Sequence, residues 1–168
     1  MIKKFLIYIE NLSSNTTDAF NLNQKSLFGE RKYGKIVYTP YEILYLIETK
    51  KAEALKNNKK LSEEKLISLF SRKFKNFIIN YSAFKDMRKK GYIIKPGLKF
   101  GSEFRVYKTK KDKHASWILF PVKQSTKITW EDFVAKSRVC NSTGKKLLIA
   151  IVDQQESVVY YETNWFKA

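Results

Sequence analysis

The first half of the chain alternates apolar runs with polar stretches at a spacing typical of short strands. It opens with the run Lys4–Ile9 and continues through segments of β-type composition that end at Lys35–Tyr38. Runs rich in β-branched and aromatic residues, bounded by polar turns, indicate strands. The lysine-rich stretch Lys50–Lys60 is too polar for a buried element, and we interpret it as a connection.

Two helices are predicted on either side of that connection. Thr39, Pro40 and Glu42 fit the N-cap, the first-turn proline and the third position of a capping box, directly ahead of an apolar run. Beyond the connection, Ser62 is placed to cap a second helix. Its apolar positions recur at helical spacing and predict one buried stripe, which consists of Leu66, Phe70, Phe74, Phe77 and Ile78.

The second half has a different pattern. A helix over Ser82–Lys90 is predicted to end at Gly91, which suits a left-handed cap. Short β-rich segments follow, interrupted by one helix that Thr129 caps and that reaches Cys140. The predicted strands are Tyr92–Lys95, Phe104–Tyr107, Trp117–Val122, Leu147–Val152 and Val158–Tyr161.

The change of pattern at about residues 80 to 90 indicates a domain boundary. We therefore predict an α+β fold, with a small α+β N-terminal domain at residues 1–84 and a mixed-sheet α/β domain at residues 85–168. The chain has 168 residues, of which 43% are hydrophobic, and this is enough apolar material for packed cores.

Positive charge dominates the composition. The chain carries 33 Lys and Arg against 16 Asp and Glu, a formal charge of +17. Such an excess attracts polyanions, so the composition favours nucleic acid as a partner. A lysine-rich surface that reflects adaptation to heat or codon usage is the alternative.

Cysteine usage and hydropathy favour a soluble cytoplasmic protein. Cys140 is the only cysteine and His114 the only histidine, so no intramolecular disulfide forms and the two cannot build a zinc site by themselves. The apolar opening Ile2–Ile9 is too short to span a membrane, and no signal-peptide cleavage pattern follows it. We expect no cofactor.

The candidate chemistry centres on His114, seven residues after Tyr107 and separated from it by a segment with four lysines. RNA cleavage needs one group to take the 2′-hydroxyl proton and another to protonate the departing 5′-oxygen. A histidine, with an ordinary pKa of about 6.5, can do either at neutral pH, whereas a tyrosine, at about 10, needs neighbouring cations to form phenolate. A surface or structural role for the histidine is the alternative.

A lysine at the scissile phosphate could stabilise the negative charge of the phosphorane. Lys145 and Lys146 both precede the predicted strand Leu147–Val152. Neighbours along a strand point to opposite faces, so only one of the two can reach such a site. Without Tyr107 and His114, the pair would be interpreted as a solvated strand entrance.

Several segments of the second half occur in a recognisable order. They are Lys90–Gly101, Phe104–Tyr107, His114–Leu119, Ser137–Val139, Lys145–Asp153, Val159–Tyr161 and Trp165. This ordered combination resembles the tRNA-splicing endonucleases, also called tRNA-intron endonucleases. The first half is similar to the family's N-terminal domain through Phe28–Glu30 and Tyr41–Ile47, which is a weaker match.

The resemblance implies a catalytic triad. Matched residue by residue, Tyr107 is the general base, His114 the general acid and Lys145, rather than Lys146, the group that stabilises the transition state. It also implies cleavage of precursor tRNA folded as bulge-helix-bulge. The implied products are a 2′,3′-cyclic phosphate and a 5′-hydroxyl, formed without a metal ion.

The resemblance further implies how RNA is held and how subunits assemble. Arg138 matches an arginine that stacks on a bulged base, and Trp165 either closes that sandwich or packs the terminal strand. Family members form tetramers, here a homotetramer or a heterotetramer with a structural subunit. The loop Asp153–Ser157 matches an acidic loop that docks into a neighbour but is less acidic, and Val158–Tyr161 either pairs subunits or is an ordinary buried strand.

Three other functions stay open. A non-catalytic RNA-binding or structural subunit of the same complex is expected to lack part of the triad, which is complete here. A basic winged-helix-like module would use its positive charge for binding alone, and its RNA affinity should survive loss of His114. A metal-dependent nuclease could use Glu103 and Asp132, although no convincing pair of carboxylates surrounds them.

Overall fold

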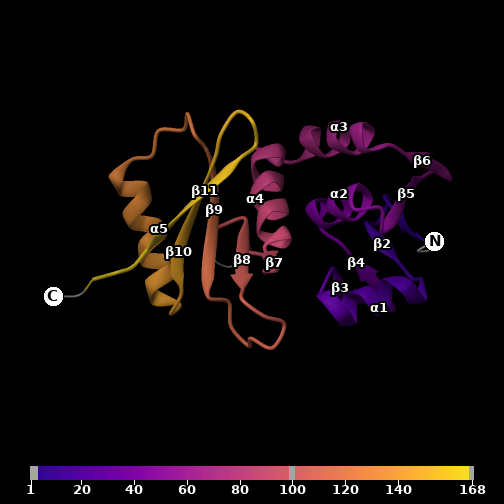
Figure 1. Cartoon of the computed structure of the whole chain (residues 1–168), viewed down its shortest axis with the longest axis horizontal. Helices are drawn as coiled ribbons and strands as arrows, with labels where there is room; N and C mark the ends of the chain where they lie inside the picture. Colours follow the sequence, from indigo (N-terminus) through magenta and orange to yellow (C-terminus); the bar gives the residue numbers. More distant parts are fainter. Residues whose placement is uncertain (1–3, 99–100, 167–168) are drawn as a thin grey trace. The chain divides into compact units, whose positions relative to one another are not determined.

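The structure, a computed structural model, describes residues 4–98 and 101–166. The chain divides into two compact units, the first ending at Ile78 and the second beginning at Ile79. Each unit combines helices with a sheet that has both parallel and antiparallel neighbours, which confirms the predicted α+β class (Figure 1). In the described ranges no helix has the length and apolarity needed to cross a membrane. Ile2 of the opening run and residues 99 and 100 of the Lys90–Gly101 motif lie outside the described residues.

The first unit holds a six-stranded sheet in the order β3-β4-β2-β1-β5-β6, in which only β1 and β5 pair in parallel. Its strands are β1 (Phe5–Tyr8), β2 (Ser13–Ser14), β3 (Glu30–Lys32), β4 (Lys35–Val37), β5 (Ala52–Lys56) and β6 (Lys59–Leu61). Its helices are α1 (Thr17–Ser26), α2 (Pro40–Glu48) and α3 (Glu63–Lys73).

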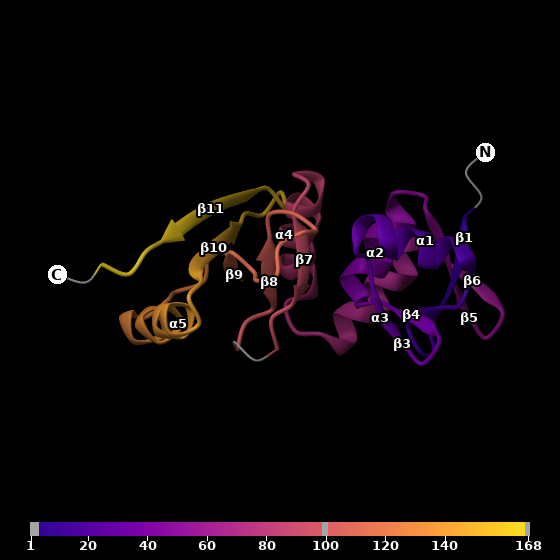
Figure 2. The same ribbon diagram turned by 90° about the horizontal axis from the view of Figure 1, so that it is seen from below.

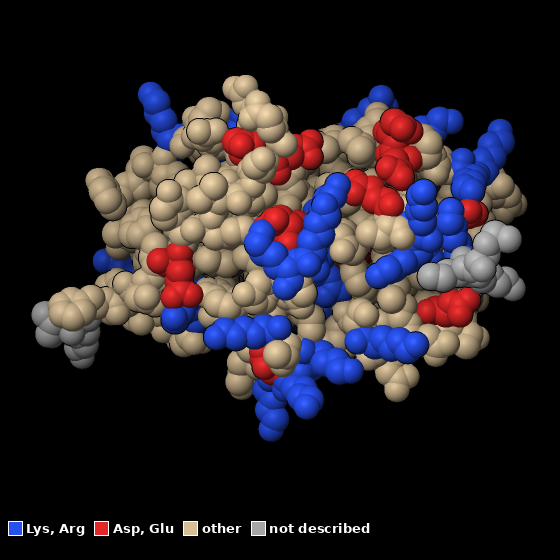
Figure 3. Space-filling model, in the orientation of Figure 1, with Lys and Arg blue, Asp and Glu red and all other residues tan. Residues whose placement is uncertain are grey.

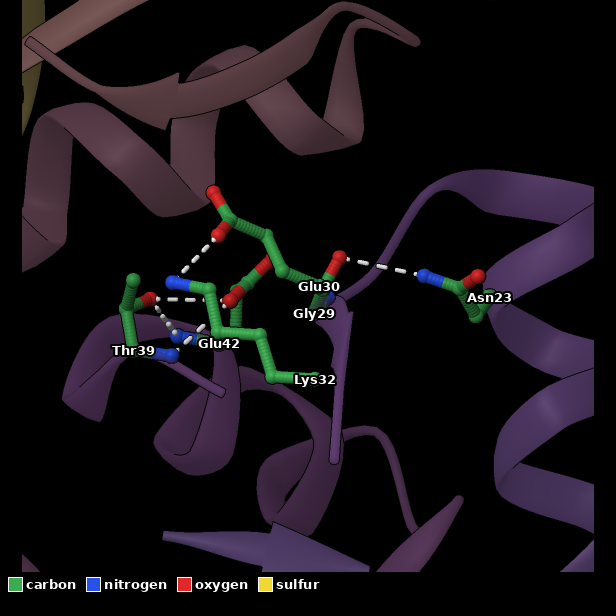
Figure 4. Close-up of polar contacts among 6 residues, drawn as sticks. All are labelled: Asn23, Gly29, Glu30, Lys32, Thr39 and Glu42. Atoms are coloured by element: carbon green, nitrogen blue, oxygen red, sulfur yellow. Dashed lines mark hydrogen bonds and ion pairs between the residues drawn. The ribbon is translucent and has the colours of Figure 1, made fainter. Parts of the chain in front are cut away.

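The capping box predicted for α2 is confirmed and has a second use. The Thr39 side chain accepts from the Glu42 N–H, and the Glu42 carboxylate accepts from the Thr39 N–H at 2.9 Å. The same carboxylate, almost fully buried, also accepts from the Gly29 N–H at 2.8 Å (Figure 4). Asn23 of α1 donates to the Gly29 carbonyl at 3.0 Å. One buried acid therefore ties the start of the β3–β4 hairpin to α2.

Three elements of the first unit, namely α1, β5 and β6, were not predicted. Helix α1 begins at an N-cap, Thr16, whose side chain accepts from the Ala19 N–H, although its apolar pattern is weak. The interpretation of Lys50–Lys60 as a connection is wrong, because this stretch forms the β5–β6 hairpin. Its two turn residues, Asn57 and Asn58, both have positive φ, as a two-residue hairpin turn requires, and asparagine tolerates that conformation.

The predicted stripe from Leu66 to Ile78 does not belong to one helix. Helix α3 ends at Lys73, Phe74 is extended with φ −122° and ψ 120°, and Asn76 has φ 56°. A new helix, α4 (Phe77–Lys89), therefore begins earlier than the Ser82 predicted for it. Phe77 still joins the core of the first unit, because its ring stacks on Tyr41 with centroids 5.2 Å apart.

The second unit holds a five-stranded sheet in the order β11-β10-β9-β8-β7. Its strands, all of which were predicted, are β7 (Ile93–Pro96), β8 (Phe104–Tyr107), β9 (Trp117–Lys123), β10 (Lys146–Val152) and β11 (Val158–Thr163). Strands β9 and β10 are parallel and the other neighbours antiparallel. The predicted Thr129-capped helix, α5 (Trp130–Ser142), connects the two parallel strands.

Helices α4 and α5 pack on opposite faces of this sheet (Figure 2). On one, the α4 face, Phe84 contacts Phe104 with ring centroids 5.9 Å apart, and the Tyr160 hydroxyl donates to Asp86 at 2.7 Å. On the other, the α5 face, a buried cluster joins the sheet to α5 and consists of Ile118, Phe120, Leu147 and Cys140. Alternation along the strands assigns every second side chain to each face.

Candidate active site

One end of the second sheet brings together the three chain segments that carry the predicted triad. Ser116 links them, because its N–H donates to the Val106 carbonyl at 2.9 Å and its own carbonyl accepts from the first N–H of β10 at 3.1 Å. Tyr107, His114 and Lys145 each lie within two residues of a partner in this link. The antiparallel pairing of β8 with β9 and the parallel pairing of β9 with β10 make this meeting possible.

Tyr107 is the last residue of β8 and is half-buried. Alternation places it on the same face as Arg105, the α5 face, while the intervening Val106 is fully buried on the other. The Arg105 guanidinium carbon lies 5.9 Å from the centroid of the Tyr107 ring. The phenol therefore has a permanent cation against its π face.

Arg105 is also unusual in its hydrogen bonding. Its Nε is buried, and it has no acceptor among the described residues. A buried donor without an acceptor lowers stability by about 1–3 kcal/mol.

His114 lies in the loop between β8 and β9 and is exposed. Asp112 organises this loop by accepting from the Thr109 N–H at 3.0 Å and from the Thr109 hydroxyl at 2.9 Å. These bonds, the backbone bond foremost, lower the pKa of the Asp112 carboxyl. Lysine side chains gather around the loop at the lower edge of Figure 3, so the imidazole stands in a surface attractive to a polyanion.

The two adjacent lysines engage different elements. The Lys146 ammonium lies 2.7 Å from a Glu162 carboxylate oxygen on β11, and the Trp117 indole donates to the same carboxylate at 2.6 Å. The bond from Lys146, followed by that from Trp117, lowers the pKa of the Glu162 carboxyl. The Lys145 ammonium instead donates to the Thr143 carbonyl, at the end of α5, at 2.8 Å.

A hollow of about 410 Å³ lies beside Lys145, lined by residues of α5, β10 and the chain after β11. Trp165 lines it, lies beyond the end of β11 and is 54% exposed. Ser137 also lines it, and the buried Ser137 hydroxyl has no partner among the described residues. Arg138, the next residue of α5, is exposed and does not line the hollow.

Cys140 lies at the wall of the hollow. Burial raises the pKa of its thiol to about 11, and the nearby charge of Lys145 opposes this rise.

The carboxylates considered for a metal site are placed differently. Asp132 accepts a bond from the Thr129 hydroxyl at 3.0 Å and so belongs to the cap of α5. Glu103 is exposed in the chain just before β8. Within residues 4–98 and 101–166, no three His, Cys, Asp or Glu side chains gather in a way that could hold a metal ion.

Sequence reasoning did not single out Arg105, Ser137 or Glu162. Arg105 could have been found, because it lies two residues before Tyr107 in a predicted strand and so shares its face. Glu162 could not, because its pairing with Lys146 depends on the register of β10 and β11. Ser137 lay within a quoted motif, but its burial follows from the packing of α5.

The groups at this sheet end suit one class of chemistry. The segments that carry a half-buried tyrosine, an exposed histidine and a lysine meet at the end of a sheet beside a basic loop. Phenol and imidazole groups can move protons, and an ammonium can stabilise an oxyanion, so these residue types are the ones that an acid/base nuclease needs.

Comparison with known proteins gives the family. The tRNA intron endonuclease catalytic C-terminal domain matches residues 77–160. A tRNA-splicing endonuclease of Thermococcus onnurineus is 38% identical over 87% of this chain and 85% of its own, and one of Thermococcus kodakarensis is 34% identical over 97% and 98%. One of Nanoarchaeum equitans is 35% identical over 75% and 86%. The chain therefore belongs to the tRNA intron endonuclease family and is an endonuclease.

Proposed function

We propose that the protein cuts precursor tRNA at intron boundaries folded as bulge-helix-bulge, leaving 2′,3′-cyclic phosphate and 5′-hydroxyl ends. The names of the relatives support tRNA as the substrate, and the charge of +17 suits a polyanion. The observation that carries the proposal is the link at Ser116, which joins the segments of Tyr107, His114 and Lys145 at one sheet end.

The proposed reaction assigns one task to each residue. Tyr107 takes the proton of the 2′-hydroxyl, whose oxygen then attacks phosphorus. His114 gives a proton to the 5′-oxygen as the P–O5′ bond breaks, so the products form without added water. Lys145 donates to the non-bridging oxygens, where negative charge accumulates. No step requires a metal ion.

Lys145 is favoured over Lys146 by the face of the sheet on which each lies. The Lys146 ammonium is engaged by Glu162 on β11, on the α4 face, and leaving that carboxylate would break an ion pair. Alternation from Lys146 places Lys145 toward the α5 face, which is the face of Tyr107.

The RNA-binding and assembly roles are part of the same proposal. Arg138, exposed on α5, and Trp165, at the hollow, would hold an unpaired base by stacking. Two such sites in a tetramer would address the two bulges. In the loop predicted to dock, the Asp153 carboxylate accepts from the backbone N–H groups of Gln155 and Ser157. Because this acid holds its own loop, docking into a neighbour would fall to the other residues of the loop, and the assembly is either a homotetramer or a heterotetramer with a structural subunit.

The test uses the purified chain, a bulge-helix-bulge RNA and EDTA. We expect cleavage at both boundaries, 3′ ends that resist polyadenylation until the cyclic phosphate is opened and the resulting phosphate removed, and 5′ ends that accept phosphate from a kinase. Loss of activity in EDTA, with recovery on adding a divalent ion, would contradict the metal-free reaction. Native mass of the active species distinguishes the homotetramer from an assembly that needs a second subunit.

A further inference from the structure

The neighbour of Tyr107 on the α5 face is Arg105, to which the reaction above gives no task. Both side chains come from β8, two residues apart, and the guanidinium carbon lies 5.9 Å from the ring centroid. Strand alternation puts both side chains on the same face of the sheet, so the guanidinium is within reach of the ring. Any change of charge on the ring is therefore sensed by Arg105.

The fold gains little from a guanidinium at this position. The Arg105 Nε is buried without an acceptor in the described part of the chain, and the side chain makes no ion pair with a described carboxylate. A methionine of similar length would cover the same surface without burying an unsatisfied donor. A group that weakens the fold and touches a reacting side chain is a candidate for a role in the reaction.

We propose that Arg105 is a positioning residue for the general base: it holds the Tyr107 ring against β8 and stabilises the phenolate. The inference rests on the proposed function, in which Tyr107 takes the 2′-hydroxyl proton. A cation over a π face is attracted more strongly when the ring carries negative charge, so the contact favours the form that accepts the proton. Arg105 itself touches neither the phosphate nor the sugar.

The other charged groups around Tyr107 are less specific to its ring. Lys95 pairs with Arg105 across the β7–β8 ladder and is a diagonal neighbour of Tyr107, which itself pairs with the apolar Ile93. Lys108 follows in the chain, but its ammonium lies over the Trp117 ring at 5.2 Å. Lys95 thus offers a matched control, since its removal takes one positive charge from the same row without touching the ring contact.

The test is a double-mutant cycle on single-turnover cleavage at saturating enzyme. With Tyr107 present, Arg105→Met should lower the rate about 2- to 30-fold, the range expected for a cation–π contact. In a Tyr107→Phe background the same change should have no further effect, because no phenolate forms there. Arg105→Lys should recover part of the rate, and Lys95→Met should stay within about twofold of the parent protein.

A second substrate shows which proton transfer is affected. An RNA with sulfur in place of the bridging 5′-oxygen has a thiolate leaving group that departs without a proton. His114→Ala should be largely rescued on it, whereas Arg105→Met should keep its full deficit. The RNA affinity of Arg105→Met, measured on the same preparations, should be unchanged. Its melting temperature should be unchanged or raised.

Two outcomes would overturn the role of Arg105: the same fold loss with and without the Tyr107 hydroxyl, or no loss in either background. Rescue of Arg105→Met by the sulfur substrate would also overturn it, because rescue would show that Arg105 acts on protonation of the leaving group. Failure of the proposed function looks different, because Tyr107→Phe alone would then cleave at the parental rate whatever Arg105 does.

Discussion

The two faces of the second sheet use polar groups in different ways. On the α4 face, Tyr160 bonds to Asp86 and Lys146 to Glu162, so each of these groups has a partner from another element. On the α5 face, Arg105 Nε and the Ser137 hydroxyl are buried without partners among the described residues. The two α4-face pairs are thus satisfied within the fold, while the two α5-face donors are not satisfied by the described residues.

The largest expected effect falls on Lys145, whose neighbour Lys146 belongs to the other face. Lys145→Ala should lower the single-turnover rate about 10²- to 10³-fold, as loss of one preorganised donor at an oxyanion does. Lys145→Arg should restore only part of it, because a planar guanidinium does not replace a compact ammonium.

Lys146→Ala is the matched control for that experiment. It should cleave at nearly the parental rate and lose only an exposed ion pair, worth about 0–1 kcal/mol. Normal cleavage by Lys145→Ala together with failure of Lys146→Ala would move the assignment by one residue and reverse the roles of the two faces.

Removal of the imidazole should have the next largest effect. His114→Ala should slow cleavage about 10²-fold or more, because a general acid typically contributes that much. The side chain is exposed in its loop, so melting temperature and RNA affinity should hardly change. A variant that unfolds instead would make His114 structural.

Arg138→Ala tests RNA capture rather than chemistry. Stacking of a base on a planar side chain is worth about 1–3 kcal/mol, so affinity for the bulge-helix-bulge RNA should fall on the order of tenfold. The rate at saturating enzyme should fall less than in Lys145→Ala. Trp165→Ala should weaken binding similarly if both residues hold the base, and unchanged affinity in both variants would remove them from the site.

The α4 face should respond in stability alone. Tyr160→Phe removes the bond to Asp86 and should lower the free energy of unfolding by about 1 kcal/mol. Urea unfolding measures that change, and cleavage at saturating enzyme should equal the parental rate. A loss of cleavage without a loss of stability would show that the division between the two faces is wrong.

The smallest effect is expected at Cys140, on the wall of the hollow. Burial raises the pKa of its thiol to about 11, so almost no thiolate exists at pH 8. Iodoacetamide should modify the native protein far more slowly than the protein unfolded in urea. Fast modification of the native protein would mean that the Cys140 thiol becomes exposed to solvent.

Local signals in the sequence predicted much of this fold. The capping box of Thr39 and Glu42 predicted α2, and short β-rich segments predicted all five strands of the second sheet. Periodicity failed where the backbone leaves the helix without changing the spacing, as it does between Phe74 and Asn76. The stripe from Leu66 to Ile78 looks continuous because Phe74 and Phe77 keep a helical spacing across the break at Asn76.

The candidate reacting residues could be predicted from the sequence where a residue type is rare. A single histidine seven residues after Tyr107 directs attention to one loop. The partners of those residues depend on register: Glu162 reaches Lys146 only because β10 and β11 pair antiparallel with Leu148 opposite Glu162. Burial of Arg105 Nε and Ser137 likewise depends on how the helix and strands pack.

The parallel pairing of β9 with β10 has a consequence for synthesis of the protein. Tyr107 and His114 leave the ribosome before Lys145, and the strand that follows Lys145 is the neighbour of β9 in the sheet. A nascent chain therefore carries an incomplete set of reacting groups until residues up to Val152 have emerged and can pair. With the proposed triad, a chain that ends before Lys145 lacks one reacting group and is not expected to cut the RNA around it.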